Sequence, residues 1–219
     1  MLVNNSADFD AVTKAIRERR TLKVLSDDPL PSSLDKETVE DLLDSASWAP
    51  FHKAASREHR DNRSLNSMVP WRCYVLDSIC CRELRQVLIE DGDTTKIPMM
   101  LASASTLLQF TWLPNPGAGE DQLFDPTVEN MEHIAAGSAA IQNLLIAATA
   151  RGIRTYWSSG GGLRKLQNLR RLRIPDAEIV LGSVFLFPPE TNNCKTAHGK
   201  LRDQRGAIDT WASWVERQE

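Results

Sequence analysis

The stretch TVENMEHIAAGSAAIQNLLIAATA, residues 127–150, decides how this chain of 219 residues folds. Its second half is apolar nearly all round, which is typical of a helix buried on several sides. The uncharged part, residues 134–150, is shorter than the roughly 20 residues that a bilayer demands, and Gly137 and two polar amides interrupt it. A second uncharged stretch, residues 97–119, contains three prolines. We therefore expect a buried core helix at 127–150 and no membrane span.

Shorter elements are expected on both sides of this helix, because apolar residues at helical spacing predict helices and runs of branched and aromatic residues predict strands. The expected helices cover residues 9–18, 35–49, 79–90, 163–172 and 205–217. The expected strands cover residues 71–76, 104–112, 154–158 and 178–187. Residues 54–69 are polar and charge-mixed, without periodicity. The pattern predicts one helix-rich α+β domain over residues 1–219, with 54–69 as an inserted loop.

The composition is that of an ordinary globular protein, with 42% apolar and 25% charged residues. The 26 Lys and Arg residues against 29 Asp and Glu residues provide no overall attraction for nucleic acid. The cysteines, at positions 73, 80, 81 and 194, form no CxxC pair, which favours a reducing compartment over a disulfide framework. No secretion signal is evident after Met1, so a soluble cytoplasmic protein is expected.

Signatures of the common hydrolases, nucleotide-binding proteins and zinc enzymes are missing. The sequence contains no GxSxG, GxxxxGK[ST], HExxH or strand-following GxGxxG motif. The four histidines show no metal-ligand spacing, and Glu129 and His133, one helical turn apart, are typical of a helix surface. The basic run at 164–173 lacks interleaved aromatic residues, which favours a solvated face over a nucleic-acid site. We expect neither a metal nor a nucleic-acid partner.

Two cationic segments lie near opposite ends of the chain. Residues 19–23, RRTLK, close the first expected helix, where cations complement the helix dipole. The same residues suit a phosphate clamp, because guanidinium groups bind phosphate oxygens in a forked geometry and Thr21 adds a hydroxyl donor. Lys200 and Arg202 offer two more cations, in a position also typical of a solvated tail. The pattern by itself leaves both interpretations open.

Several segments together resemble one known family. Residues 19–23 resemble the RRSxR/K opening of the nitroreductase family of FMN-dependent flavoenzymes. Residues 48–53, WAPFHK, and 70–76, PWRCYVL, look like its aPxxxxxxPWrFxVl segment. Residues 136–145, AGSAAIQNLL, are similar to its long central helix, and 157–160, WSSG, to the W-x-[ST]-G of one branch. The order and spacing of these segments cover nearly all of the chain.

The resemblance implies a mainly antiparallel central sheet flanked by helices. It also implies an intertwined homodimer with two FMN sites at the subunit interface. The residues implied to hold the FMN phosphate and ribityl chain are Arg19, Arg20 and Thr21, with Lys200 and Arg202 closing on the phosphate.

A second group of residues is implied to contact the flavin ring: Trp157, Ser158, Ser159 and Gly160, with a backbone N–H near N5. A flexible turn before a helix is the alternative for the glycines at 160–162. Lys23 is implied to lie toward the pyrimidine edge, where its charge would stabilise the reduced flavin. No catalytic acid or base is expected, because the flavin itself carries the electrons.

The implied reaction is hydride transfer from NADH or NADPH through flavin N5 to small electrophiles such as nitroaromatics or quinones, in a ping-pong cycle. Two alternatives stay open: another reaction on the same flavin scaffold, such as reductive dehalogenation, ene reduction or dehydrogenation, and a flavin-binding protein without turnover. The sequence departs from the family where Phe51, His52 and Lys53 replace Ser and an amide. The insertion 54–69 is either a surface loop or a substrate lid, and Trp71 suits the core as well as a flavin contact.

Overall fold

The computed structural model describes residues 6–31, 34–61, 65–115, 124–191 and 194–215. The α-helices in these ranges are α1 (Ser6–Glu18), α2 (Lys36–Ser47), α3 (Arg57–Arg60), α4 (Ser78–Glu90), α5 (Ile97–Ser103), α6 (Val128–Ala150) and α7 (Leu166–Arg171). The strands are β1 (Leu22–Leu25), β2 (Trp71–Leu76), β3 (Thr106–Trp112), β4 (Arg154–Ser158), β5 (Ile179–Phe187) and β6 (Lys195–His198). Short 3-10 helices occupy Gly161–Arg164, Arg202–Gln204 and Ile208–Thr210.

The central sheet has the strand order β2-β3-β5-β4, and every neighbouring pair is antiparallel. β3 lies inside the sheet and is buried along its whole length, so each polar side chain on it needs a partner. Oε1 of Gln109 on β3 accepts a hydrogen bond from the hydroxyl of Ser183 on β5 at 2.6 Å, whereas its Nε2 has no partner among the described residues. The expected α+β class with a mainly antiparallel sheet is confirmed.

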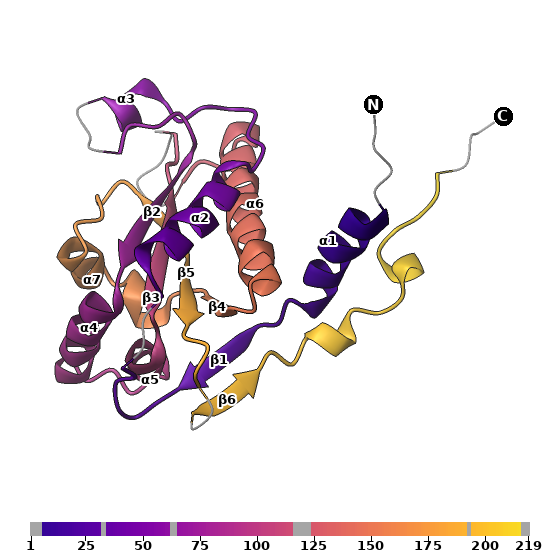
Figure 1. Cartoon of the computed structure of the whole chain (residues 1–219). Helices are drawn as coiled ribbons and strands as arrows, with labels where there is room; N and C mark the ends of the chain where they lie inside the picture. Colours follow the sequence, from indigo (N-terminus) through magenta and orange to yellow (C-terminus); the bar gives the residue numbers. More distant parts are fainter. Residues whose placement is uncertain (1–5, 32–33, 62–64, 116–123, 192–193, 216–219) are drawn as a thin grey trace.

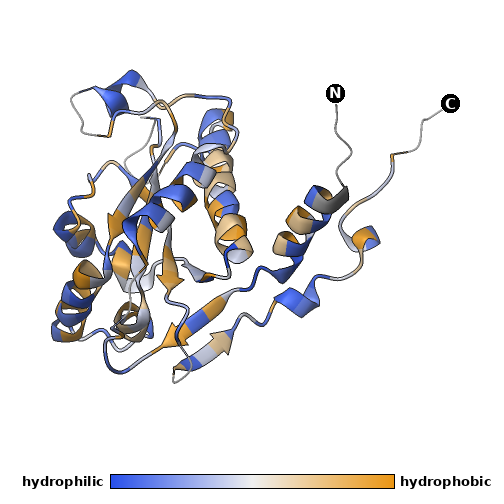
Figure 2. Cartoon of the chain, in the orientation of Figure 1, coloured by the Kyte–Doolittle hydropathy of each residue, from blue (hydrophilic) through white to orange (hydrophobic). Residues whose placement is uncertain are grey.

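Helices cover both faces of this sheet (Figure 1). α2 and α6 pack over one face, where Leu42, Ile141 and Leu144 are completely buried. α4 and α5 pack over the other face together with β1, around residues such as Leu101 and Phe185. In Figure 2, β5 is hydrophobic along its length, whereas α2 and α4 alternate hydrophilic and hydrophobic residues. The inner strands β3 and β5 are thus buried on both sides, and these helices each have one solvated side.

The long helix α6 begins and ends where local chemistry allows. Thr127 is the N-cap, and its hydroxyl accepts a hydrogen bond from the N–H of Asn130 at 3.2 Å. After Arg151 the chain turns at Gly152, whose φ of +70° favours glycine. Within the described ranges, α6 is the one helix long and apolar enough to cross a membrane, by length and composition alone. In the fold its apolar side chains pack against the sheet and α2, so the buried core helix expected at 127–150 is confirmed.

Both ends of the chain form an arm, consisting of α1, β1, β6 and residues 199–215 (Figure 1). Within it β1 packs against α5 and β4, and α1 contacts α6. β1 and β6 pair antiparallel, with Leu22 opposite His198. The buried Val24 anchors β1 to the α4 and α5 side of the core. The apolar residues Phe9 and Val12 of α1 nevertheless stay exposed, at 71% and 56%. The paired chain ends thus form an arm on which part of α1 keeps apolar surface exposed.

Four helices and strands of the described fold were absent from the sequence-based expectation: β1, β6, α3 and α5. β1 is only four residues long and follows a basic run, and β6, KTAH, has no apolar alternation. α5 lies in an uncharged stretch where a short buried helix has no polar face to reveal its period. The helix expected at 163–172 divides at Lys165 into a 3-10 turn and α7.

The helix expected at 205–217 is wrong for the described part of the tail. Residues 205–215 contain one short 3-10 turn at Ile208–Thr210, and Arg217 lies outside the described residues. Gly206 adopts a φ of +74°, which interrupts a helix. Trp214 is 98% exposed, so tertiary packing does not stabilise a helix here.

Candidate anion-binding site

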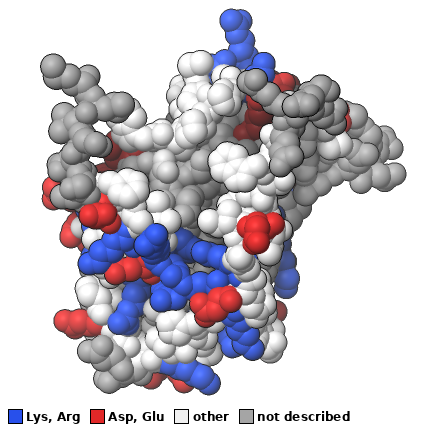
Figure 3. Space-filling model, turned by 90° about the vertical axis from the view of Figure 1, so that its right-hand side faces the viewer, with Lys and Arg blue, Asp and Glu red and all other residues white. Residues whose placement is uncertain are grey.

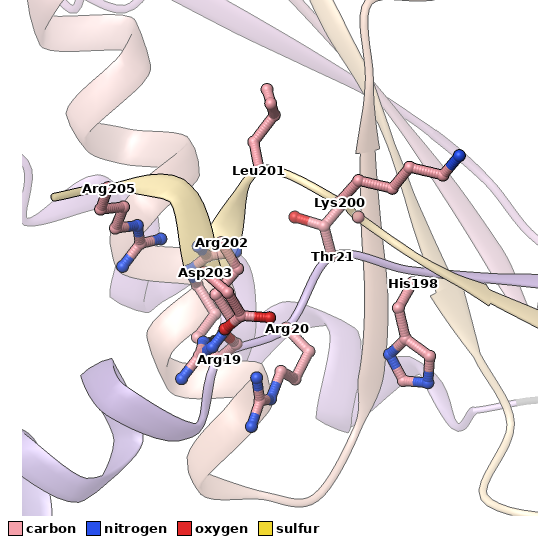
Figure 4. A pocket seen from close by; sticks show the side chains of 10 residues that line it. Arg19, Arg20, Thr21, His198, Lys200, Leu201, Arg202, Asp203 and Arg205 are labelled. Atoms are coloured by element: carbon pink, nitrogen blue, oxygen red, sulfur yellow. Dashed lines mark hydrogen bonds between the residues drawn. The ribbon is translucent and has the colours of Figure 1, made fainter.

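A cavity of about 580 Å³ lies in the arm, where the end of α1 meets the segment that follows β6. Its lining comes from two short stretches near opposite ends of the chain: Arg19, Arg20 and Thr21, and then His198, Gly199, Lys200, Leu201, Arg202, Asp203 and Arg205. Figure 4 shows the arginines of both stretches on the same side of the point where the two backbones meet, with Lys200 and Leu201 extending away from them. On this side of the molecule Lys and Arg side chains group together, with some acidic side chains among them (Figure 3).

Main-chain hydrogen bonds hold the two stretches together. The N–H of Gly199 donates to the carbonyl oxygen of Thr21 at 2.9 Å, which extends the pairing of β1 with β6. Arg202 donates from Nη1 to the carbonyl oxygen of Arg19 at 2.7 Å and from Nη2 to the carbonyl oxygen of Arg17. These carbonyls belong to the end of α1, where backbone oxygens lack helical partners. Arg202 therefore closes the helix and joins the two chain ends.

The electrostatics of the cavity are strongly positive. Burial lowers the pKa of Arg19, and the nearby positive charges of Arg205 and Arg202 lower it further. Among the described residues that line the cavity, five are cationic and one, Asp203, is acidic. Like charges gathered in this way repel each other unless an anion lies between them. A cluster of this kind favours an anionic ligand, and the fork of a guanidinium group suits a phosphate.

The structure brings together five of the residues that the sequence singled out: Arg19, Arg20, Thr21, Lys200 and Arg202. Arg202 interacts with the end of α1 and also lines the cavity, and the binding of a phosphate by these residues stays a prediction. The pairing of β1 with β6 brings these five residues together, since it places residues near position 20 beside residues near position 200.

Lys23 lies outside this cavity, on β1, two residues beyond Thr21 of the cavity lining. Side chains alternate along β1: Leu22 and Val24 are buried in the core, whereas Lys23 is half-buried. Lys23 therefore projects from the same face as Thr21. Its ammonium nitrogen lies over the ring of Tyr156 on β4, 4.9 Å from the ring centre.

The segment Trp157 to Gly160 does not line the cavity and packs within its own chain. Trp157 lies so close to Gly182 that a Cβ atom on that glycine would come within 2.1 Å of Nε1. The buried Ser158 accepts a hydrogen bond from the N–H of Gly160 at 3.1 Å, and Arg164 donates to the carbonyl oxygen of Ser159 at 2.8 Å. Gly160 adopts a φ of +106°. Gly160 thus leads into the 3-10 helix Gly161–Arg164, and the contact of this segment with flavin stays a prediction.

The altered segment Phe51 to Lys53 also lies apart from the cavity. All three side chains are exposed, and Phe51 packs edge-on against Trp71 with ring centres 5.9 Å apart. Trp71 is itself only 6% exposed and belongs to the core beside α2 and α6. Of the two interpretations of Trp71, the structure supports the core residue.

The insertion 54–69 is anchored to the sheet. The N–H of Ala55 donates to the carbonyl oxygen of Met68 at 2.9 Å, which joins the two ends of the insertion. The buried Arg72 of β2 donates to carbonyl oxygens of Leu65 and Ser67, at 3.0 and 2.9 Å. The segment also contains α3, which the aperiodic sequence did not reveal, and residues 62–64 lie outside the described ranges. None of its described residues lines the anion-binding cavity.

Some cavity residues were missed by the sequence analysis, namely His198, Gly199, Leu201, Asp203 and Arg205. Arg205 follows Arg202 by three residues, a spacing that a tight turn brings to one side and that could have been noticed. His198 carries no sequence signal, because its place depends on the register of β6 against β1. The described residues hold no group of three or more His, Cys, Asp or Glu that could bind a metal ion.

Comparisons with known proteins agree with this fold. The model of the nitroreductase family matches residues 16–185, which is more than half of the chain. No curated protein matches the sequence significantly. Among solved structures, the chain is similar to a nitroreductase-like family protein from Bacillus cereus, with a TM-score of 0.64, 18% identity, and coverage of 94% of this chain and 96% of that one.

Two further solved structures are similar in fold. One is a nitroreductase candidate from Desulfovibrio desulfuricans in complex with FMN, with a TM-score of 0.57, 20% identity, and coverage of 88% of this chain and 94% of that one. The other, a candidate NADH dehydrogenase/NAD(P)H nitroreductase from Parabacteroides distasonis, has a TM-score of 0.55, 20% identity, and coverage of 91% and 98%. Since the family model covers most of its length and its architecture agrees, the chain belongs to the nitroreductase family.

Proposed function

We propose that this protein is a cytoplasmic FMN-dependent oxidoreductase that takes hydride from NADH or NADPH and reduces small electrophiles such as nitroaromatics or quinones. The observation that carries the proposal is the cavity in which Arg19, Arg20 and Thr21 meet Lys200 and Arg202. The FMN in the structure from Desulfovibrio desulfuricans and the NAD(P)H in the name of the protein from Parabacteroides distasonis support it.

The donor set of the cavity fits a phosphomonoester. Arg20 and Lys200 form no ion pair with any described carboxylate, so their charges are available to a ligand. Thr21 supplies a hydroxyl donor. Arg202 already uses both terminal nitrogens on main-chain carbonyls, so it contributes mainly its charge. These residues would hold the phosphate of FMN through charge-assisted hydrogen bonds.

The flavin, when bound, supplies the two-electron chemistry between the nicotinamide donor and the acceptor. The chain's own contribution is to place charge and to shape the site. Lys23, two residues beyond Thr21 on the same face of β1, would bring a positive charge toward the ring and favour its more negative, reduced form. The packed segment from Trp157 to Gly160 would border the ring with rigid main chain.

A homodimer is part of the proposal, because the arm exposes apolar side chains that a second copy of this chain would cover. Phe9, Val12 and Ile16 follow one face of α1 and are 71%, 56% and 49% exposed. In the tail, Trp211 and Trp214 are 71% and 98% exposed. Apolar surface of this kind on a projecting arm is typical of an interface between subunits.

The test uses the full chain, purified and saturated with FMN. We expect a flavin absorbance spectrum that survives gel filtration, and loss of the oxidised bands when NADH or NADPH is added without oxygen. Restoration of the bands by a nitroaromatic or a quinone completes the expected result.

Other outcomes of this test decide between the alternatives. Protein that stays colourless after incubation with FMN would refute the proposal. Bound FMN that neither nucleotide reduces would instead indicate a flavin-binding protein without turnover. Reduction by NAD(P)H, with reoxidation by halogenated or unsaturated acceptors but not by nitro compounds or quinones, would indicate another reaction on the same scaffold.

A further inference from the structure

The contact between Lys23 and Tyr156 joins the arm to the central sheet. Lys23 lies on β1, and Tyr156 lies on β4, the edge strand of the four-stranded sheet. The ammonium nitrogen of Lys23 is 4.9 Å from the centre of the tyrosine ring, within the range of a cation–π interaction. No carboxylate of the described residues forms an ion pair with Lys23. The aromatic face is therefore the main feature of the described chain that orients this charge.

Tyr156 itself is held firmly. It pairs directly with Phe185 of β5 in the antiparallel register, and the two rings pack with their centres 6.3 Å apart. Phe185 is completely buried and belongs to the core formed with α4 and α5. The side chain of Tyr156 points away from the face that Trp157 occupies, because neighbouring residues of a strand alternate. Its ring is thus part of the rigid sheet.

Lys23 in contrast carries its charge at the end of a four-carbon chain with several rotatable bonds. Such a side chain loses considerable conformational entropy when its charge is confined to one place. An aromatic face that attracts the ammonium group confines it without neutralising it, whereas a carboxylate partner would cancel its charge. The charge then stays effective toward a ligand that lies along β1.

We propose that Tyr156 is a positioning residue, which holds the ammonium group of Lys23 at the ring end of the flavin site. This inference rests on the proposed function, since it assigns the part of this chain that sets the balance between oxidised and reduced FMN. Tyr156 acts through Lys23, and its phenol hydroxyl takes no part. The attraction that holds the ammonium group comes from the aromatic face of Tyr156.

The experiment measures binding and redox potential instead of turnover. The wild-type protein is loaded with FMN and compared with Tyr156→Phe, Tyr156→Leu and Lys23→Met, and with the double variant. For each protein, fluorescence titration measures the affinity for oxidised FMN, and anaerobic spectroelectrochemistry measures the midpoint potential. Tyr156→Phe is the matched control, because it keeps the aromatic face and removes only the hydroxyl.

We expect Tyr156→Phe to retain the wild-type potential. In Tyr156→Leu we expect the preference for reduced over oxidised FMN to fall about tenfold, which corresponds to a potential about 30 mV lower for a two-electron couple. The affinity for oxidised FMN should change much less. In a Lys23→Met background the Tyr156→Leu substitution should not change the midpoint potential further, because the charge that Tyr156 positions is gone.

A fluorinated phenylalanine at position 156 serves if the leucine variant does not fold, because it keeps the ring shape but weakens the negative face. It should lower the potential as leucine does. An unchanged potential in that variant, or an equal decrease with and without Lys23, overturns the inference and leaves the proposed function intact. Wild-type protein that binds no FMN overturns both.

Discussion

Arg20 offers the sharpest test of the phosphate site, because its side chain lines the cavity and makes no contact on which the fold depends. It is exposed, and it makes no hydrogen bond or ion pair within the described chain. Arg202 in contrast closes the end of α1, so its replacement would mix folding with binding. The substitution Arg20→Gln removes one positive charge and keeps a polar side chain of similar length.

The expected magnitude follows from the hydrogen bonds that a guanidinium group makes to a phosphate. Each hydrogen bond to a charged group contributes about 1.5–3 kcal/mol, which corresponds to about a 10- to 150-fold change in Kd. Because Arg20 is exposed and screened by salt, we expect the lower end, about a tenfold weaker affinity for FMN. Since no intramolecular contact is lost, the free energy of unfolding without ligand should change by less than about 0.5 kcal/mol.

The assay compares FMN with riboflavin, which has the same ring and chain but no phosphate. Quenching of flavin fluorescence measures both affinities at low and at moderate salt, and urea unfolding measures stability. Arg17→Gln is the matched control, because it removes the same charge from α1 at a position whose side chain does not line the cavity. Arg20→Gln should weaken the affinity for FMN and leave the affinity for riboflavin unchanged. Arg17→Gln should change neither affinity by more than about twofold. Equal weakening of both flavins, or unchanged FMN binding, would refute the placement of the phosphate at Arg20.

Four further outcomes test other parts of the structure. Asp203→Asn removes the acidic group from the cavity lining and should tighten FMN binding about two- to fivefold in the same titration, and weaker binding would contradict the placement of the anion. Gly182→Ala should lower the free energy of unfolding by about 1–3 kcal/mol in urea, because the new Cβ would lie 2.1 Å from Trp157 Nε1; an unchanged midpoint would speak against this packing. Burial raises the pKa of Cys81 from 9.0 to about 12, so the folded protein keeps a proton that the unfolded chain loses. Its stability should therefore be fully present below about pH 9 and fall by up to about 1.4 kcal/mol per pH unit between about pH 9 and 12, a decrease that Cys81→Ala should lack in denaturation curves across that range. Ile16→Asp, on the exposed apolar face of α1, should convert a dimer to a monomer in light scattering, and a mass unaffected by the charge would exclude that face from the interface.

Local patterns were sufficient for the central part of the fold. The strands at 71–76 and 154–158 were predicted with their observed bounds, and the helix expected at 127–150 is observed at Val128–Ala150. Branched and aromatic residues mark the strands, and apolar residues mark the helix. The prediction of a helix at 205–217 was wrong because the apolar residues of this segment have nothing in the described chain to pack against.

The sequence by itself determined the family, the α+β class and the identity of the basic residues, because these depend on residue types and short spacings. Only the tertiary structure decided which of these residues meet. The register of β1 with β6 sets Arg19 and Arg20 beside Lys200 and Arg202, and packing places Lys23 over Tyr156. A contact between residues far apart in the chain depends on strand pairing and core shape, which no local pattern records.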